Sequence, residues 1–446
     1  MAEENKDKLK KVLVIAYGFP PAGGSSSIRT VKFCKYLPRF SWKPVVLTVR
    51  KPRVLDWDPG LLDDIPKDID VYRTPSMEPP YFLYNRSNKV TNKSCRFPSK
   101  VTRFLGGVFR KIRYAFFIID ERIGWVPFAF LKGLGILRKE KDLNLIYISV
   151  KPFSSLFIAI LLKKISGLPL VIDFRDAWTD FNPYFWKDKP SYLLRLEAFI
   201  EKLAVDTADR VISVNENIVN DFMTKYAYSP ASKFDYIPNG FDREDFDGAL
   251  LPQNKDLFCI TYAGNLYAER SPEDFFTALK MLLKDSPDLR KSIRFRYLGR
   301  ITGANYKFFC DGELKGIIQL EGMLPYRECL RIIRQSNLLL FIEDQVAISD
   351  RLLPSKIFEY LASGRPVLAL AENGPVKDLV INSASGAVIG HGDVNAIKEK
   401  ILYFIENGQK TDFNQGHPRN RLINEYSREL AAKKLTDIFN AINNTP

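Results

Sequence analysis

Short, continuous apolar runs alternate with segments of helical periodicity along this chain, and the alternation occurs twice. The runs lie at residues 12–16, 45–49, 145–150, 170–173 and 210–214 in the first half, and at 258–263, 294–298, 338–342, 367–370 and 386–389 in the second. Runs without polar alternation are typical of parallel strands that helices cover on both faces. The pattern predicts an α/β protein with two Rossmann-like, doubly wound parallel-sheet domains.

The predicted domains follow one another in tandem. A stretch rich in Asp, Gly and Pro separates the halves, so we expect a first domain at 1–240, a linker at 241–255 and a second domain at 256–420. A C-terminal helix within 421–446 is expected to pack back on the first domain. Parallel sheets bind ligands beyond the carboxyl ends of their strands. Two sheets facing a cleft would therefore hold a substrate between them.

One segment, residues 79–119, contains no acidic residue and nine Lys or Arg, which account for most of the net charge of +14. Its apolar residues recur at helical i, i+4 spacing, which predicts a basic amphipathic insert at about 85–119. Such a helix can lie on an anionic membrane. The alternative is a solvated basic face that packs on the protein's own core. The residues that we expect to face a membrane or an anionic acceptor are Arg103, Arg110, Lys111 and Arg113.

The composition disfavours several other classes of protein. Five scattered cysteines without a CxxC pair favour reduced thiols over a disulfide framework. The only histidines are His391 and His417, so we expect neither a histidine-based metal site nor a Ser-His-Asp triad. No stretch resembles a signal peptide or reaches the roughly 18 apolar residues of a membrane span. We expect a cytoplasmic protein, at most peripheral on the inner face of the cell membrane.

Two motifs follow predicted strands in the first half. Gly23 and Gly24 would let the backbone approach a ligand, and the helix after them would present N–H groups to an anion. Their spacing is not G-x-G-x-x-G, which disfavours a nicotinamide or flavin site. Asp176 ends the string Asp-Phe-Arg-Asp, where a carboxylate could accept a hydrogen bond or a proton from a sugar hydroxyl. The alternative for the two glycines is an ordinary strand-to-helix turn. The alternative for the second motif is that Asp173 and Arg175 pair with each other or cap a helix.

Two further motifs lie in the second half. Gly264 and Asn265 follow the first strand of that half, and Arg270 comes soon after with the bidentate, permanently charged fork that suits a diphosphate. Lys356 and Glu359 are three residues apart and share one face of a predicted helix. An ammonium suits phosphate, and a carboxylate can accept hydrogen bonds from both hydroxyls of a ribose. The alternative is a surface i, i+3 ion pair.

The order of these strings resembles the retaining GT-B glycosyltransferases of family 4. The matching strings are Pro20-Pro-Ala-Gly-Gly24, Ala208-Asp-Arg-Val-Ile-Ser213, Ile237-Pro-Asn-Gly-Phe-Asp242, Glu321-Gly322 with Pro325-Tyr326, and Lys356 to Pro366. The resemblance covers nearly the whole chain and implies a GT-B fold. It also implies that a nucleoside-diphosphate sugar is bound mainly by the second domain.

The resemblance implies a role for each candidate residue. Glu359 would bind the ribose, Arg270 the diphosphate, and Lys356 the phosphates or the sugar. Asp176 would face the acceptor or the transferred sugar. The candidate catalytic residues are thus Asp176, Arg270, Lys356 and Glu359, and the donor-binding residues are Gly23, Gly24, Gly264, Asn265, Arg270, Lys356 and Glu359.

The chain departs from the family pattern in three places. Arg351 occupies the position of the first Glu of the E-x7-E motif, Asn265 stands where the family has a basic residue, and the first-domain histidine is absent. Glu343, Asp344 or Asp350 could take the place of the missing glutamate, and the sequence does not choose among them.

The expected activity is therefore sugar transfer with retention, from a nucleoside-diphosphate sugar to a hydroxyl acceptor, without metal or cofactor. By analogy with the family, the setting would be cell-surface polysaccharide or glycolipid assembly, with a lipid-linked or saccharide acceptor and an anionic membrane as partners. One alternative is a nucleotide-sugar epimerase of similar architecture. Another is a non-catalytic membrane- or polyanion-binding protein. Nucleic acid is not expected as a partner, because the basic segment lacks a recognisable RNA or DNA module.

Overall fold

The computed structural model describes residues 9–54, 56–78, 119–180, 189–247, 256–267, 269–301, 303, 305–346, 348–407 and 419–443. The predicted basic insert, with Arg103, Arg110, Lys111 and Arg113, lies outside these residues except for its last position. The predicted linker is described only at 241–247. Among the described residues, no helix combines the length and the apolar character that crossing a membrane requires.

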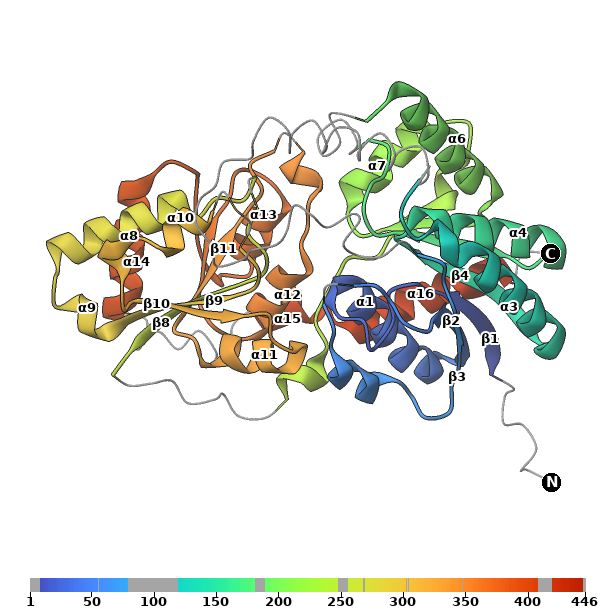
Figure 1. The fold of residues 1–446 in the computed structure, drawn as a ribbon, viewed down its shortest axis with the longest axis horizontal. Helices are drawn as coiled ribbons and strands as arrows, with labels where there is room; N and C mark the ends of the chain where they lie inside the picture. The colour runs from blue at the N-terminus through green and yellow to red at the C-terminus, as the bar shows by residue number, and fades with distance from the viewer. Residues whose placement is uncertain are drawn as a thin grey trace. The chain divides into compact units, whose positions relative to one another are not determined.

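The chain forms two compact units, each built on a parallel sheet (Figure 1). The first unit contains residues 1–55, 62–237 and 432–446, and the second contains residues 56–61 and 238–431. Two short segments therefore belong to a unit other than the one that their place in the sequence suggests. These are residues 56–61 and the last part of the C-terminal helix.

The sheet of the first unit has seven strands in the order β3-β2-β1-β4-β5-β6-β7, and all neighbouring strands are parallel. The strands are β1 (Lys10–Ile15), β2 (Trp42–Val49), β3 (Asp70–Thr74), β4 (Leu143–Val150), β5 (Leu170–Phe174), β6 (Arg210–Ser213) and β7 (Phe234–Tyr236). The α-helices are α1 (Gly24–Tyr36), α3 (Val126–Lys139), α4 (Leu156–Ser166), α6 (Ser191–Thr207) and α7 (Glu216–Lys225).

The C-terminal helix α16 (Arg428–Asn443) contributes to the core of the first unit. The ring of Phe439 lies 5.0 Å from that of Trp42 and 6.0 Å from that of Tyr147, measured between centroids. Phe439 and Trp42 are fully buried. The aromatic contacts thus join the end of the chain to strands β2 and β4.

The sheet of the second unit has six strands in the order β10-β9-β8-β11-β12-β13, again all parallel. The strands are β8 (Phe258–Ala263), β9 (Ile293–Leu298), β10 (Ile318–Gly322), β11 (Leu338–Ile342), β12 (Val367–Leu370) and β13 (Gly386–Ile389). The α-helices are α8 (Glu273–Asp285), α9 (Leu289–Ser292), α10 (Tyr306–Phe309), α11 (Tyr326–Gln335), α12 (Ser355–Ala362), α13 (Pro375–Asn382), α14 (Val394–Asn407) and α15 (Arg419–Asn424).

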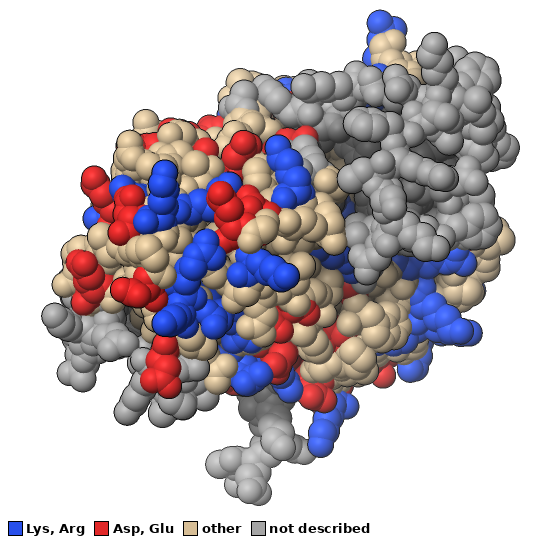
Figure 2. All heavy atoms as spheres, turned by 60° about the vertical axis from the view of Figure 1, so that its left-hand side comes forward, with Lys and Arg blue, Asp and Glu red and all other residues tan. Residues whose placement is uncertain are grey.

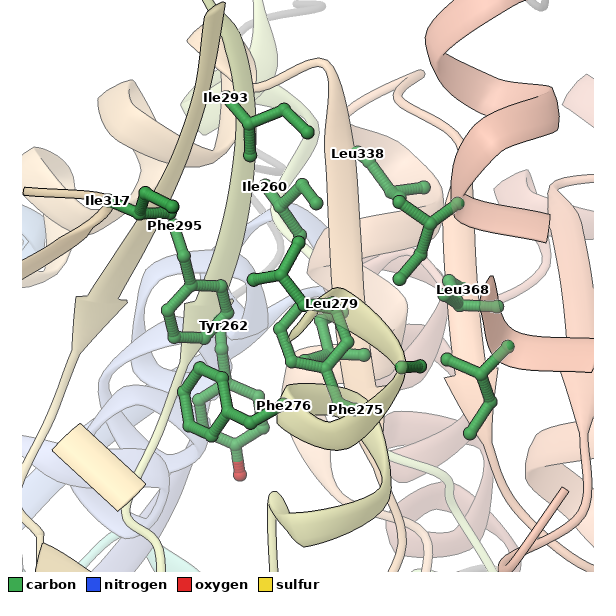
Figure 3. Packing of buried hydrophobic residues seen from close by; sticks show 14 of the residues in the cluster. Ile260, Tyr262, Phe275, Phe276, Leu279, Ile293, Phe295, Ile317, Leu338 and Leu368 are labelled. Atoms are coloured by element: carbon green, nitrogen blue, oxygen red, sulfur yellow. The ribbon is translucent and has the colours of Figure 1, made fainter. Parts of the chain in front are cut away.

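Strand β11 shows why this sheet needs helices on both faces. Leu338, Leu340 and Ile342 belong to one buried cluster, whereas Leu339 and Phe341 belong to the cluster on the opposite face. Side chains alternate across a strand, so a strand that is apolar at every position must bury both faces. In Figure 3, Phe275, Phe276 and Leu279 of α8 lie against the side chains of β8 and β9 on one of these faces. The predicted doubly wound architecture is confirmed.

The surface charges of the described residues do not form a field of one sign on the face that Figure 2 presents, where Lys and Arg side chains alternate with Asp and Glu. Among the described residues, surface ion pairs include Lys280 with Asp311 and Lys398 with Asp285. Outside the acid-free segment at 79–119 the whole chain has an excess of only five positive charges. The positive charge is thus a local property of that segment.

Candidate functional site

The candidate residues of the second unit gather at the carboxyl ends of β8 and β11, which are neighbouring parallel strands. Gly264 directly follows β8, and Glu343 and Asp344 directly follow β11. Gly264 has a φ of +132°, and a Cβ atom at this position would lie 3.4 Å from the Nζ atom of Lys356. A glycine here therefore lets the backbone lie close to the Lys356 ammonium.

Arg270 is buried at this edge and held by a carboxylate. Its Nη2 atom lies 2.7 Å from Oδ2 of Asp344, and both side chains are less than a tenth exposed. The guanidinium also lies over the ring of Tyr267, at 4.9 Å from the centroid. Asn305 donates hydrogen bonds to the carbonyl oxygens of Tyr267 and Arg270, at 2.8 and 3.1 Å, which fixes the loop that carries Arg270.

Lys356, in the first turn of α12, is the second cation of the site. Its Nζ donates a hydrogen bond to Oη of Tyr262 at 2.9 Å and lies 4.0 Å from the centroid of that ring and 4.9 Å from that of Phe341. Desolvation, together with the positive charge of Arg270, lowers the pKa of Lys356 well below its ordinary value. A negative charge beside Lys356 would offset this penalty and favour the charged form of the amine.

Glu359 lies on the same face of α12 as Lys356, three residues further along the helix, and is mostly buried. Its carboxylate accepts a hydrogen bond from the hydroxyl of Tyr326, and burial together with the charge of Glu359 raises the pKa of that tyrosine well above its ordinary value. Lys356 and Glu359 therefore have different partners, on β8 and α11. A surface i, i+3 ion pair does not describe them.

The three acidic residues that could replace the missing glutamate differ in their partners. Asp344 pairs with Arg270, and Asp350 pairs with Arg351 at 2.9 Å. Glu343 is buried; its Oε2 accepts a hydrogen bond from the backbone N–H of Glu372 at 3.1 Å, and within the described chain its Oε1 has no hydrogen-bond partner. Desolvation, with a contribution from the charges of Asp344 and Glu372, raises the pKa of Glu343 to about 7.

Asn265 has a structural contact in addition to its predicted role in donor binding. Its Oδ1 accepts a hydrogen bond from the backbone N–H of Arg300 at 3.0 Å, which links the loops that follow β8 and β9. Because β8 and β9 are adjacent strands, this bond fixes the backbone beside Gly264. The contact of Asn265 with a donor stays a prediction.

The candidate residues of the first unit are Gly23, Gly24 and Asp176. Gly23 is the N-cap of α1, and Gly24 has the left-handed φ of 83° that favours glycine. Asp176 is 43% exposed and pairs with Lys151 at 2.9 Å. Desolvation raises its pKa, but the positive charges of Lys151 and Arg175 outweigh this and hold the pKa below its ordinary value.

The other residues of the Asp176 string have structural partners. Asp173 is buried and pairs with Arg29 at 2.9 Å, and the hydroxyl of Tyr147 donates to it at 2.7 Å. Arg175 donates to the carbonyl oxygen of Val150 at 3.0 Å. The suggested pairing of Asp173 with Arg175 is wrong, because Arg29 of α1 supplies the buried cation.

Three residues of the second-unit site were missed from the sequence. Tyr262 is the last but one residue of an apolar strand, so its pattern is that of a core residue, and only its hydroxyl contact with Lys356 distinguishes it. Tyr326 belongs to the Pro325-Tyr326 string, and nothing in that string indicates a contact with Glu359. Asn305 lies in a loop without any local signal. Within the described chain, no cluster of three or more His, Cys, Asp or Glu side chains could hold a metal ion.

Comparisons with known proteins agree with this architecture. A family model described as glycosyltransferase family 4 matches residues 91–245. No curated protein matches the chain.

The similar solved structures cover nearly the whole chain. Sucrose-phosphate synthase from Thermosynechococcus elongatus is 14% identical, with a TM-score of 0.63 over 97% of this chain and 99% of that one. Anabaena Alr3699/HepE, in complex with UDP, is 14% identical, with a TM-score of 0.59 over 97% and 100%. A glycosyltransferase from Rickettsia africae is 16% identical, with a TM-score of 0.59 over 98% and 100%. The chain therefore has the GT-B fold, and residues 91–245 match the model of glycosyltransferase family 4.

Proposed function

We propose that this protein is a retaining glycosyltransferase that moves a sugar from a nucleoside-diphosphate donor to a hydroxyl acceptor. The observation that carries the proposal is the pair of cations at one edge of the second sheet, Arg270 and Lys356, with Glu359 on the same helix face. Two adjacent cations destabilise each other until an anion binds between or beside them. A diphosphate is an anion of suitable charge.

The donor would be a nucleotide sugar. Glu359 would accept hydrogen bonds from the ribose hydroxyls while Arg270 and Lys356 contact the diphosphate. The structurally similar HepE has been crystallised with UDP and with UDP-glucose, which supports a nucleotide of this kind. Glu343 is the acidic residue that we assign to the transferred sugar, because its Oε1 atom has no partner in the described chain, whereas Asp344 and Asp350 are paired with arginines.

In this proposal, the positive charges of Arg270 and Lys356 stabilise the negative charge of the leaving nucleoside diphosphate, as a metal ion does in other transferases. Arg270 is held in place by Asp344 before the donor binds, so little reorganisation is needed when charge develops on the leaving group. The leaving phosphate would help to remove the proton of the acceptor hydroxyl on the same face of the sugar. Asp176 would face the acceptor or the transferred sugar, and Gly23 and Gly24 would approach the phosphate and the sugar of the donor.

The acceptor class is proposed from the family pattern and the sequence. An acid-free, basic segment in the first half of the chain suits a lipid-linked acceptor or an anionic membrane surface. We therefore place the reaction in polysaccharide or glycolipid assembly at the inner face of a cell membrane.

Donor turnover in site variants tests the proposal. A panel of nucleotide sugars is first screened by thermal shift, because a bound ligand raises the apparent stability. With the best donor, Arg270→Ala should lower kcat by about 100-fold or more, and Glu359→Ala should raise the donor KM about tenfold to 100-fold. Lys280→Ala and Glu328→Ala, which remove surface ion pairs of the same unit, are the controls. Wild-type rates in both site variants would refute the assignment.

Product analysis separates the alternatives. An epimerase would convert the donor sugar without any acceptor, whereas a transferase would leave it unchanged apart from slow hydrolysis. A non-catalytic polyanion-binding protein would bind anionic liposomes but show no heat of nucleotide binding by calorimetry.

A further inference from the structure

A short segment from the first half of the sequence belongs to the second unit. Residues 56–61, to which we refer as the strap, are held there by two polar contacts. Asp56 forms an ion pair with Arg300 at 2.7 Å, and Asp58 accepts a hydrogen bond from the backbone N–H of Tyr326 at 2.7 Å. The second oxygen of Asp58 accepts from the N–H of Gly60 at 3.0 Å, and Leu61 is buried. The strap is therefore fixed at several points.

The strap lies at the same edge of the sheet as the two cations. Arg300 follows β9, and Tyr326 follows β10, whereas Gly264 and Arg270 follow β8. All these strands are parallel, so their carboxyl ends lie at one edge. Strands are spaced by about 4.8 Å, which places the end of β10 about 10 Å from that of β8. The contacts of the strap are thus one and two strands away from the cations.

A series of side-chain contacts also leads from the cations to the strap. Lys356 lies beside Gly264 and near Arg270, and Glu359 lies three residues further along α12. The carboxylate of Glu359 accepts from the hydroxyl of Tyr326, and the N–H of Tyr326 donates to Asp58 of the strap. The order is therefore cations, then Glu359, then strap. In a nucleoside diphosphate the order is phosphates, then ribose, then base.

Trp57 lies in the strap between the two anchored aspartates, and 55% of its surface is exposed. Asp56 and Asp58 hold the backbone on both sides of Trp57 at this edge. The backbone of Trp57 would therefore lose little conformational freedom when a ligand binds. An exposed aromatic face can stack on a planar base, and such stacking contributes about 1–3 kcal/mol per base. We propose that Trp57 is the stacking platform for the nucleobase of the donor, an inference that rests on the proposed function.

Calorimetry with two kinds of ligand tests this assignment. Wild-type protein, Trp57→Ala and Trp57→Phe are titrated with UDP, GDP and ADP, and with inorganic pyrophosphate, which has no base. Trp57→Ala should weaken binding of the preferred nucleoside diphosphate about tenfold or more. Trp57→Phe should retain most of the affinity because it keeps an aromatic face. Pyrophosphate should bind all three proteins equally.

Tyr403→Ala, which removes another exposed aromatic side chain of the second unit, is the matched control and should bind every ligand as the wild type does. Nucleoside diphosphate binding that is unchanged in Trp57→Ala would overturn the inference and leave the proposed function intact. Equal losses for pyrophosphate and nucleoside diphosphate would also overturn it, because they would show that the strap acts only by shaping the cation site. If the wild type binds no nucleoside diphosphate, the proposed function itself fails.

Discussion

Lys356 is a buried cation whose surroundings disfavour its positive charge. Its Nζ atom is surrounded by the rings of Tyr262 and Phe341, and Arg270 is close enough to disfavour a second positive charge. Its ammonium does hydrogen-bond the Tyr262 hydroxyl, but this single neutral partner does not compensate the loss of water. The charge of Lys356 should therefore be linked to ligand binding.

This linkage predicts a pH dependence of nucleoside diphosphate affinity. Below the lowered pKa of free Lys356 the ammonium is already charged, and binding needs no proton. Above that pKa the neutral amine must take up a proton to pair with the diphosphate, so affinity should fall as pH rises. Lys356→Arg should flatten this fall, because a guanidinium stays charged. Calorimetry across pH 6–10 in buffers of different ionisation enthalpy measures the proton uptake, and an identical pH slope in both proteins would contradict the prediction.

Some strands of the two sheets have a recognisable apolar run in the sequence, and others do not. All ten runs predicted as strands lie within or overlap strands of the structure. The strands that were missed, β3, β7 and β10, are edge strands of their sheets. Their residues are largely exposed or half-buried, so they lack a continuous apolar run. An edge strand pairs on one side only, and its pattern therefore carries less of the hydrophobic signal.

The carboxyl ends of β8 and β9 meet at two glycines. Gly299 has a φ of +152°, and a Cβ atom there would overlap the carbonyl oxygen of Gly264. Gly299→Ala should therefore destabilise the second unit and weaken donor binding, since Gly264 borders Lys356. We expect a loss of about 1–3 kcal/mol in urea unfolding. Gly312→Ala, where a Cβ atom meets nothing within 4 Å, should be nearly neutral, and an equal loss in both variants would refute this explanation.

At the scale of the whole molecule, the two ends of the sequence meet in the first unit. Phe439 of α16 is fully buried against Trp42 and Tyr147, although about 400 residues separate it from Trp42. Phe439→Ala should destabilise the protein by about 3–5 kcal/mol, because the cavity would lie between large rings that cannot close it. Lys433→Ala, on an exposed position of the same helix, is the control. A wild-type unfolding midpoint for Phe439→Ala would show that α16 is dispensable.

Local patterns were sufficient for the fold class and for most of the residues proposed here to bind the donor. Strand and helix periodicity reflects which faces of an element are buried, and this can be read from neighbouring residues. The same holds for Lys356 and Glu359, since their common helix face follows from a spacing of three.

The partners of these residues could not be found in that way, because they are distant in the sequence. Arg270 meets Asp344 across 74 residues, Lys356 meets Tyr262 across 94, and Asp58 meets the backbone of Tyr326 across 268. Strand order and the meeting of loops at one sheet edge decide these contacts. They determine which carboxylate has no cation beside it, which tyrosine lies beside Lys356 and which unit holds the strap. Burial of each strand is a local property, but the neighbours of a strand end are set by the packing of the entire unit.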